Sequence, residues 1–338
     1  MRIRPASALL VAVLVACAAP AGAGEAQARS PQEAIASGLA WLRGQQQADG
    51  GMGGRFRVGV TGLAALAHLA AGTTPDLPEH GPAVRRMLVF LANAANEKGY
   101  LGGDESRMYG HGIALLAVAN ALGTTRDDDL EERLRLVLGR GLAITIEAAR
   151  VGKPESQRGG WRYQPDEASA DLSVSGWQLA ALHAARRAGM EVPDEVMRNA
   201  LAYVRGMVTE DGKVGYAARG EDRPTMRGLA IFALDLQGGV RDPLRDRILA
   251  RAQAEPITWA GPWLFYRAYY DAVGFGRCEP AAWPAMRERL HAALLPNQSK
   301  DGSWPAPPGD NEREYGAAYA TALAVLGLSV DLRLLPAF

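Results

Sequence analysis

Cysteine is nearly absent from this sequence of 338 residues, which contains only Cys17 and Cys278. If the N-terminal segment that holds Cys17 is removed, Cys278 has no partner for an intramolecular disulfide. A chain without disulfides depends on a sizeable hydrophobic core, and about 300 residues are enough to form one. Hydrophobic residues make up 48% and charged residues 22% of the sequence, which indicates an ordinary globular protein.

The sequence also lacks an excess of charge of either sign, with 37 Lys and Arg residues against 37 Asp and Glu residues. A balanced chain has no overall field that attracts nucleic acid or an anionic membrane, so no nucleic-acid partner is expected. Beyond the N-terminal segment there is no apolar run of about 18 residues, the length that a membrane-spanning helix needs. Frequent alanine and sparse β-branched residues favour an all-α fold.

Residues 1–28 have the composition of a secretory signal peptide, with early arginines, an apolar stretch and then small residues. Signal peptidase would cut after Ala23 or Ala28. Alternatively, the sequence Leu-Val-Ala before Cys17 resembles a bacterial lipobox, which would leave Cys17 lipid-modified at the new N-terminus. We therefore expect an exported protein that is periplasmic, extracellular or a lipoprotein, attached to a membrane only through this lipid. Residues 29–338 are expected to form one domain.

Six segments share one plan: a helix with charges on one face, a loop rich in glycine and aromatic residues, and a helix of small apolar residues. Such internal periodicity indicates a repeat architecture. The loops read DGGMGG, KGYLGG, QRGGWRY, DGKVGY, WAGPW and DGSWP. Equivalent positions in four of the second helices are occupied by Gly62, Gly112, Gly176 and Gly228.

The two kinds of helix differ in how they distribute apolar residues. The first helix of each segment is amphipathic, and the second is apolar almost all round, which predicts that it is buried. Charged outer helices around buried inner helices favour a closed ring, with an open superhelix as the alternative. The inner helices are expected at residues 60–72, 110–122, 172–188, 225–237, 263–273 and 316–328.

One short pattern occurs near both ends of the chain. It places a glutamine three residues before an Asp-Gly pair and ends in a large apolar residue. The first copy consists of Gln46, Asp49, Gly50 and Met52, and the second of Gln298, Asp301, Gly302 and Trp304. This pattern resembles the QW motif of squalene–hopene and oxidosqualene cyclases. The chain as a whole resembles the prenyltransferase/squalene-oxidase repeat family over roughly residues 31–330.

The resemblance implies an α6/α6 toroid of six helix–loop–helix repeats around a central cavity. It implies a structural role for the QW residues. Gln46 and Gln298 would bond terminal backbone groups of an outer helix, which otherwise lack partners. The Asp-Gly pairs would form turns in which glycine takes a positive φ, and Trp304 would pack between repeats.

The sequence lacks most of the catalytic and metal-binding motifs that are known from such toroids. The paired acids of class II cyclases, Asp-x-Asp-Asp, are absent, and Asp171 is the nearest single carboxylate, either a helix N-cap or a functional acid. The acidic segment 126–134 is interpreted as a solvated helix start. Cys278 and the five scattered histidines do not form a zinc set, so neither a metal nor a cofactor is expected.

The starts of the inner helices would meet at one mouth of the ring, where arginines and acids alternate in the loops. The arginines are Arg55, Arg57, Arg107, Arg162, Arg219, Arg223, Arg227 and Arg313. They form either an ordinary charged surface or a site for a polar or anionic group. The segment 259–283 is rich in aromatic residues, which either pack in the core or line a ligand site.

The candidate site is placed at this mouth, because glycine-rich loops permit close backbone approach and long loops on rigid scaffolds often bind ligands. It comprises Asp171 as a candidate acid and, as ligand-binding residues, His111, Trp161, Tyr163, Trp177, Arg227, Trp263, Tyr266 and Tyr315. This hypothesis requires Asp171, Trp177 and Arg227 to border one solvent-accessible concavity. It also requires Asp171→Asn to leave stability nearly unchanged while weakening ligand binding or turnover.

The favoured function is binding of a ligand or partner at the central cavity. The candidate partners are an apolar or isoprenoid small molecule and a protein of the cell envelope. A divergent terpenoid cyclase and a carbohydrate-active toroid enzyme are the alternatives. An apolar lining with one acid would favour the first alternative, two facing carboxylates the second, and a filled centre an adaptor for an envelope protein.

Overall fold

The computed structural model describes residues 29–238 and 241–335. Within them the chain forms α-helices, short 3-10 turns and isolated bridges but no β-strand, so the predicted all-α class is confirmed. The α-helices are α1 (Pro31–Gly44), α2 (Arg57–Ala70), α3 (Gly81–Ala94), α4 (Arg107–Ala121), α5 (Asp128–Arg150), α6 (Leu172–Arg187), α7 (Asp194–Gly206), α8 (Arg227–Leu236), α9 (Pro243–Ala254), α10 (Leu264–Cys278), α11 (Trp283–Leu294) and α12 (Gly316–Leu328).

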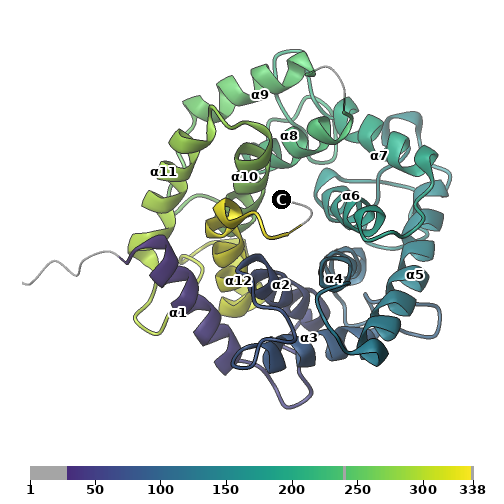
Figure 1. Cartoon of the computed structure of the whole chain (residues 1–338). Helices are drawn as coiled ribbons and strands as arrows, with labels where there is room; N and C mark the ends of the chain where they lie inside the picture. Colours follow the sequence, from purple (N-terminus) through teal and green to yellow (C-terminus); the bar gives the residue numbers. More distant parts are fainter. Residues whose placement is uncertain (1–28, 239–240, 336–338) are drawn as a thin grey trace, which may run out of the picture.

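The helices form two concentric rings (Figure 1), with the odd-numbered helices outside and the even-numbered helices inside. Each inner helix contacts the next one along the chain, and α12 contacts α2, which closes the inner ring. The predicted α/α toroid is therefore confirmed. The organisation of the helix pairs as six repeats of one helix–loop–helix unit stays a prediction.

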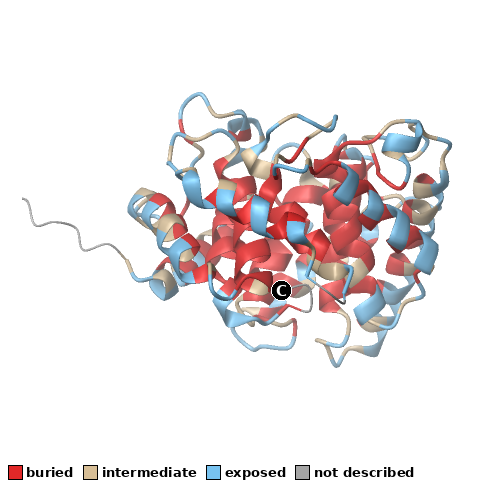
Figure 2. Cartoon of the chain, turned by 90° about the horizontal axis from the view of Figure 1, so that it is seen from above, coloured by how far each residue is buried: buried red, intermediate tan, exposed pale blue. Residues whose placement is uncertain are grey.

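The distribution of apolar residues explains the two rings. Outer helix α7 buries one face, formed by Val196, Met197, Ala200, Leu201 and Val204, and exposes the other. Inner helix α4 is buried along nearly its whole length, and Figure 2 shows the buried residues concentrated inside the ring. Full burial of each large aliphatic side chain contributes about 1.5–3 kcal/mol, so the inner ring supplies most of the hydrophobic stabilisation.

Glycine allows two inner helices to approach through their backbones. A Cβ atom at Gly228 of α8 would lie 2.2 Å from the carbonyl oxygen of Tyr270 in α10, and one at Gly274 would lie 2.3 Å from the carbonyl oxygen of Gly228. Real Cβ atoms do not come that close to backbone atoms. The contact between α8 and α10 therefore requires glycine at both positions.

The QW residues lie where successive outer helices meet. The side-chain amide of Gln46 donates to the carbonyls of Gly50 (3.0 Å) and Ala83 (2.9 Å). Ala83 lies in the first turn of the following outer helix, α3, so Gln46 bonds a terminal backbone group of an outer helix as predicted. The glutamine reaches this carbonyl because the turn at Gly50 (φ 89°) folds back beside α3.

The second QW copy makes the same contacts between the two ends of the chain. Gln298 donates to Gly302 and to Ala34 of α1, each at 2.9 Å. Trp304 is fully buried, and its indole N–H donates to the carbonyl of Leu294 at 2.8 Å. These contacts place the QW residues in the closure of the ring, with Trp304 packed between its first and last helices.

No helix among the residues that the structure describes is long and apolar enough to cross a membrane. The expected signal peptide, including Cys17 and its lipobox, lies outside the described residues.

Candidate functional site

Hydrogen bonds between neighbouring loops join the starts of the inner helices at one end of the ring. The amide of Met108 at the start of α4 donates to the carbonyl of Tyr163 (3.0 Å), in the loop before α6. The amide of Leu172 at the start of α6 donates to the carbonyl of Tyr216 (2.8 Å), in the loop before α8. Amides in the first turn of a helix have no acceptor within the helix, so the carbonyl groups of the neighbouring loops supply their hydrogen-bond acceptors.

Carboxylates play the same part at two other inner helices. Asp104, before α4, accepts from the amide of Val58 in α2 at 2.7 Å. Glu312, before α12, accepts from the amides of Phe265 and Tyr266 in α10, each at 2.9 Å. Negative charge is favourable at these positions because the first turn of a helix carries partial positive charge.

Aromatic side chains gather at this end of the ring. We call the set the tyrosine mouth, and it consists of Phe56, Tyr109, Tyr163, Tyr216, Trp263, Tyr266, Tyr315 and Tyr319. All except Tyr266 remain partly exposed. They come from the starts of α2, α4, α10 and α12 and from the loops before α6 and α8, so chain segments distant in sequence contribute to one surface.

Ring contacts connect one side of the tyrosine mouth. Tyr315 lies between Phe56 and Trp263, with ring centroids 5.4 Å and 6.1 Å away, and 5.0 Å from Tyr319. Burial raises the pKa of Tyr319 well above its ordinary value. The hydroxyl of Tyr109 is close enough to contribute to this shift. The two sides of the mouth therefore belong to one cluster.

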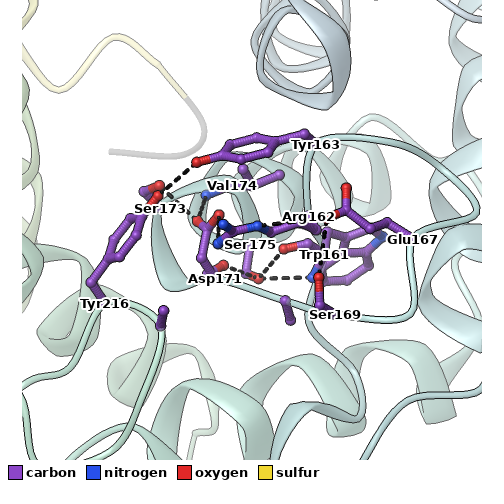
Figure 3. A network of polar contacts seen from close by, with 12 residues as sticks. Trp161, Arg162, Tyr163, Glu167, Ser169, Asp171, Ser173, Val174, Ser175 and Tyr216 are labelled. Atoms are coloured by element: carbon purple, nitrogen blue, oxygen red, sulfur yellow. Dashed lines mark hydrogen bonds and ion pairs between the residues drawn. The ribbon is translucent and has the colours of Figure 1, made fainter.

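On the other side, Tyr109 stacks near Tyr163, with ring centroids 6.1 Å apart. The hydroxyls of Tyr163 and Tyr216 are 3.0 Å apart and share a hydrogen bond, which Figure 3 shows beside the polar network around Asp171.

Asp171 is the N-cap of α6 and is fully buried. Its carboxylate accepts from the amide of Val174 (2.8 Å), the hydroxyl of Ser173 (2.7 Å) and the guanidinium of Arg162 (2.9 Å). Burial raises the pKa of Asp171, whereas these three contacts lower it. Ser173 also contacts the hydroxyl of Tyr109, so a short polar chain joins the buried acid to the mouth.

Glu312 is a second buried acid, and it was not among the predicted site residues. The hydroxyl of Tyr319 donates to its carboxylate at 3.2 Å, in addition to the two amides of α10. Burial raises the pKa of Glu312 to about 7. The tyrosine mouth is thus backed by one carboxyl group behind Tyr109 and another behind Tyr319.

The requirement that Asp171, Trp177 and Arg227 border one solvent-accessible concavity is wrong. Their exposed fractions are 0%, 2% and 3%. Trp177 is stacked on Tyr269 (5.1 Å) in the packing between α6 and α10. Arg227 is held in ion pairs with Asp222 (3.1 Å) and Glu255 (2.6 Å). Trp177 and Arg227 are therefore engaged in different contacts, an apolar packing contact and ion pairs, and the three side chains do not border a common site.

Two other predicted residues face the outer helix α5 and do not lie in the mouth. His111 is buried, accepts from the amide of Leu101 (3.2 Å) and contacts the carbonyl of Gly141 (3.1 Å), and burial lowers its pKa to about 4. Trp161 is buried and donates to the carbonyl of Thr145 (2.8 Å).

The remaining predicted residues, Tyr163, Trp263, Tyr266 and Tyr315, belong to the tyrosine mouth, and their ligand-binding role stays a prediction. The prediction omitted Tyr109, Tyr216, Tyr319 and Glu312. A usable signal was present, because Tyr109 and Tyr315 each precede a glycine at the start of an inner helix. Within the described residues, no group of three or more His, Cys, Asp and Glu side chains is placed to hold a metal ion.

No known family profile matches the chain, and no curated protein matches it in sequence. Solved structures do match its fold. The type II terpene cyclase MstE from Scytonema is 16% identical over 90% of this chain and 98% of that chain, with a TM-score of 0.59. A protein from Actinoplanes is 16% identical over 90% and 100%, with a TM-score of 0.60.

A third match has a different activity. An inactive variant of the α-1,6-mannanase GH76A of Salegentibacter sp. HEL1_6, in complex with α-1,6-mannotriose, is 10% identical over 90% of this chain and 100% of that chain, with a TM-score of 0.63. Identities this low establish a common fold and nothing about chemistry, because one fold supports many functions. By its architecture, the chain is an α/α toroid similar to both terpene cyclases and mannanases.

Proposed function

We propose that this toroid binds a small ring-bearing ligand at the tyrosine mouth. The observation that carries the proposal is that aromatic rings from six parts of the chain gather at one end of the ring and stay partly exposed. Aromatic side chains bury large apolar area and present a polar tip, which suits binding of rings that have both apolar faces and polar edges.

Unpaired polar atoms beside the mouth support this proposal. The hydroxyls of Tyr266 and Tyr270 are buried and near each other, and neither has a hydrogen-bond partner of good geometry among the described residues. A buried polar group without a partner costs about 1–3 kcal/mol. A ligand or water that hydrogen bonds to these hydroxyls would remove that cost.

Catalysis is a second candidate function, favoured by the two buried acids behind Tyr109 and Tyr319. A terpenoid cyclase needs a strong acid that gives its proton to an alkene. Asp171 is poorly suited to that role because it is paired with Arg162. Acid–base chemistry on a polar substrate needs a weaker acid and a base, for which the carboxyl group of Glu312, whose pKa burial raises to about 7, and the carboxylate of Asp171 are the candidates.

The proposal is tested with the ligands seen in similar toroids. Geranylgeranyl dihydroxybenzoate is a substrate of MstE, and α-1,6-mannotriose binds the mannanase variant. Thermal shift assays with both compounds, and mass spectrometry of small molecules that co-purify with the protein, would identify the ligand class.

The matched variants are Tyr315→Ala, within the tyrosine mouth, and Tyr100→Ala, whose ring packs on His111 and does not belong to the mouth. We expect loss of ligand binding with the first and retention with the second. Equal binding by both variants would contradict the location of the site.

Export stays part of the proposal, with Cys17 as the lipid-bearing residue if the lipobox is used. Labelling with a fatty-acid analogue should then disappear in Cys17→Ser. Labelling that persists in this variant would exclude lipidation at Cys17. An envelope protein remains a candidate partner, and capture by the exported form in crosslinking experiments would test it.

A further inference from the structure

The buried acids determine which hydroxyl groups of the tyrosine mouth donate and which accept hydrogen bonds. A hydroxyl has one proton to donate and two lone pairs that accept. The carboxylate of Asp171 receives donors from Arg162 and Val174 and is therefore an acceptor for the Ser173 hydroxyl, 2.7 Å away. The single proton of Ser173 is thereby used.

The contact between Ser173 and Tyr109 must then be donated by Tyr109, because Ser173 has no second proton. Tyr109 in turn has no proton left for a ligand. Its lone pairs remain, and its side chain is partly exposed in the mouth. Tyr109 therefore presents a hydrogen-bond acceptor.

Tyr319 is held in the same way by Glu312. Above pH 7, where Glu312 is a carboxylate because its pKa is about 7, the hydroxyl of Tyr319 donates to it at 3.2 Å, and the other two contacts of that carboxylate are also donors, the amides of Phe265 and Tyr266. Tyr319 is partly exposed, and its hydroxyl is close enough to that of Tyr109 for the two to interact electrostatically. Two acceptors from α4 and α12 thus share the mouth.

We propose that the ligand of the tyrosine mouth is a neutral, hydroxyl-rich ring of the carbohydrate class, whose O–H groups donate to Tyr109 and Tyr319. This inference rests on the proposed function, binding of a ring-bearing ligand at the same mouth. Separate hydroxyls of a sugar can donate to these two tyrosines, and the C–H face of the ring can pack on Tyr315 and Trp263.

Other ligand classes fit less well. A hydrocarbon chain would leave the lone pairs of Tyr109 and Tyr319 without partners, at a cost for each unpaired group. A cationic ring would meet the guanidinium of Arg107, which lies 5.9 Å from the centre of the Tyr163 ring. A carboxylate ligand could pair with Arg107 but would be repelled by the lone pairs of both tyrosines.

The test compares sugars that differ only in their hydrogen-bond donors. Binding of neutral trisaccharides, such as maltotriose and cellotriose, is measured by saturation-transfer NMR and calorimetry, together with their per-O-methylated forms. Methylation keeps the ring and the acceptor oxygens and removes every O–H donor. We expect at least one trisaccharide to bind and its methylated form to bind at least tenfold more weakly.

Variants locate the effect. Tyr109→Phe and Tyr319→Phe remove one acceptor each and should weaken trisaccharide binding about 3–10-fold, the range for one hydrogen bond. Tyr100→Phe is the matched control, because its hydroxyl is buried and has no hydrogen bond to a residue of the tyrosine mouth, and it should leave binding unchanged. Melting temperatures of all three variants confirm that they are folded.

Two outcomes would overturn the inference: absence of trisaccharide binding, or equal binding of the parent and methylated sugars. Failure of the inference leaves the proposed function standing if another ring compound binds and Tyr315→Ala abolishes that binding. If binding of every ring compound is insensitive to Tyr315, Tyr109 and Tyr319, both the inference and the proposed function are wrong.

Discussion

The side-chain amide of Gln298 donates a hydrogen bond of 2.9 Å to the backbone carbonyl of Ala34, although 264 residues separate them. The carbonyl oxygen of the same glutamine accepts from Arg29 at 2.9 Å. One side chain near the end of the chain thus binds two residues near the beginning of the described structure. Gln46 makes the corresponding contacts with Ala83 and Arg86, one helix pair away.

Gln298→Ala should therefore lower the free energy of unfolding by about 1–3 kcal/mol, because several partly buried hydrogen bonds are lost together. Chemical denaturation measures the change. Gln47→Ala is the control, since Gln47 is exposed and bonds only within its own loop, and its effect should stay within about 0.5 kcal/mol. Equal effects of the two substitutions would show that ring closure does not depend on Gln298.

Asp171→Asn should destabilise the protein by about 1–3 kcal/mol. Asparagine can still cap α6, but it removes the charge that faces the partly exposed Arg162 guanidinium. The sequence alone led to the opposite expectation, nearly unchanged stability with weakened ligand binding. Asp128→Asn, at an exposed position in the first turn of α5, is the control and should change stability by less than about 0.5 kcal/mol. Thermal and denaturant unfolding compare the two.

Glu312 should make stability depend on pH. Its pKa of about 7 in the folded protein exceeds the ordinary value of 4.5, so the folded state holds a proton that the unfolded state has released between these pH values. Stability should therefore decrease as pH rises from about 4.5 to about 7, by up to about 3 kcal/mol.

Comparison with Glu312→Gln isolates this effect, because glutamine does not titrate and the other acids, including Asp271, are unchanged. The difference in unfolding free energy between wild type and variant, measured from pH 4.5 to pH 8, should shift against the wild type as pH rises. A constant difference across this range would contradict the assignment to Glu312.

Gly228→Ala should destabilise the protein by about 1–3 kcal/mol or more, because the added methyl group would overlap the backbone of α10. Gly44→Ala is the matched control. Gly44 ends α1, and a Cβ atom there would meet no other atom within 4 Å, so alanine should be neutral or stabilising by about 0.5–1 kcal/mol. Similar losses in both variants would contradict the packing argument.

The helices themselves could be predicted from the sequence, because alternating amphipathic and apolar segments depend on local composition. The inner helix expected at 316–328 agrees with α12. The helix expected at 263–273 continues to Cys278 as α10. Glycines 274 and 276 suggested an end, but within α10 their role is close approach to neighbouring segments, including the carbonyl of Gly228.

The site could be predicted only in part. Its position at the inner-helix starts followed from the ring, and Tyr163, Trp263, Tyr266 and Tyr315 lie there. Whether an aromatic residue at such a start is buried or exposed depends on how the last helix meets the first. Ser173 and Tyr109 are 64 residues apart, and no local pattern specifies their pairing. Glu312 and Tyr319 are only seven residues apart, but the two amides that Glu312 also binds belong to α10, 46 and 47 residues away.

The closure of α12 and the QW loop onto α1 and α2 has a consequence for synthesis. Residues 29–290 can form helices and pack as an open arc, but α1 and α2 lack their last neighbours until Trp304 and α12 have left the ribosome. Contacts between such distant residues form slowly, because the entropy cost of closing a long loop comes before the contacts stabilise the chain. We therefore expect one late, cooperative folding step that waits for Trp304 and α12.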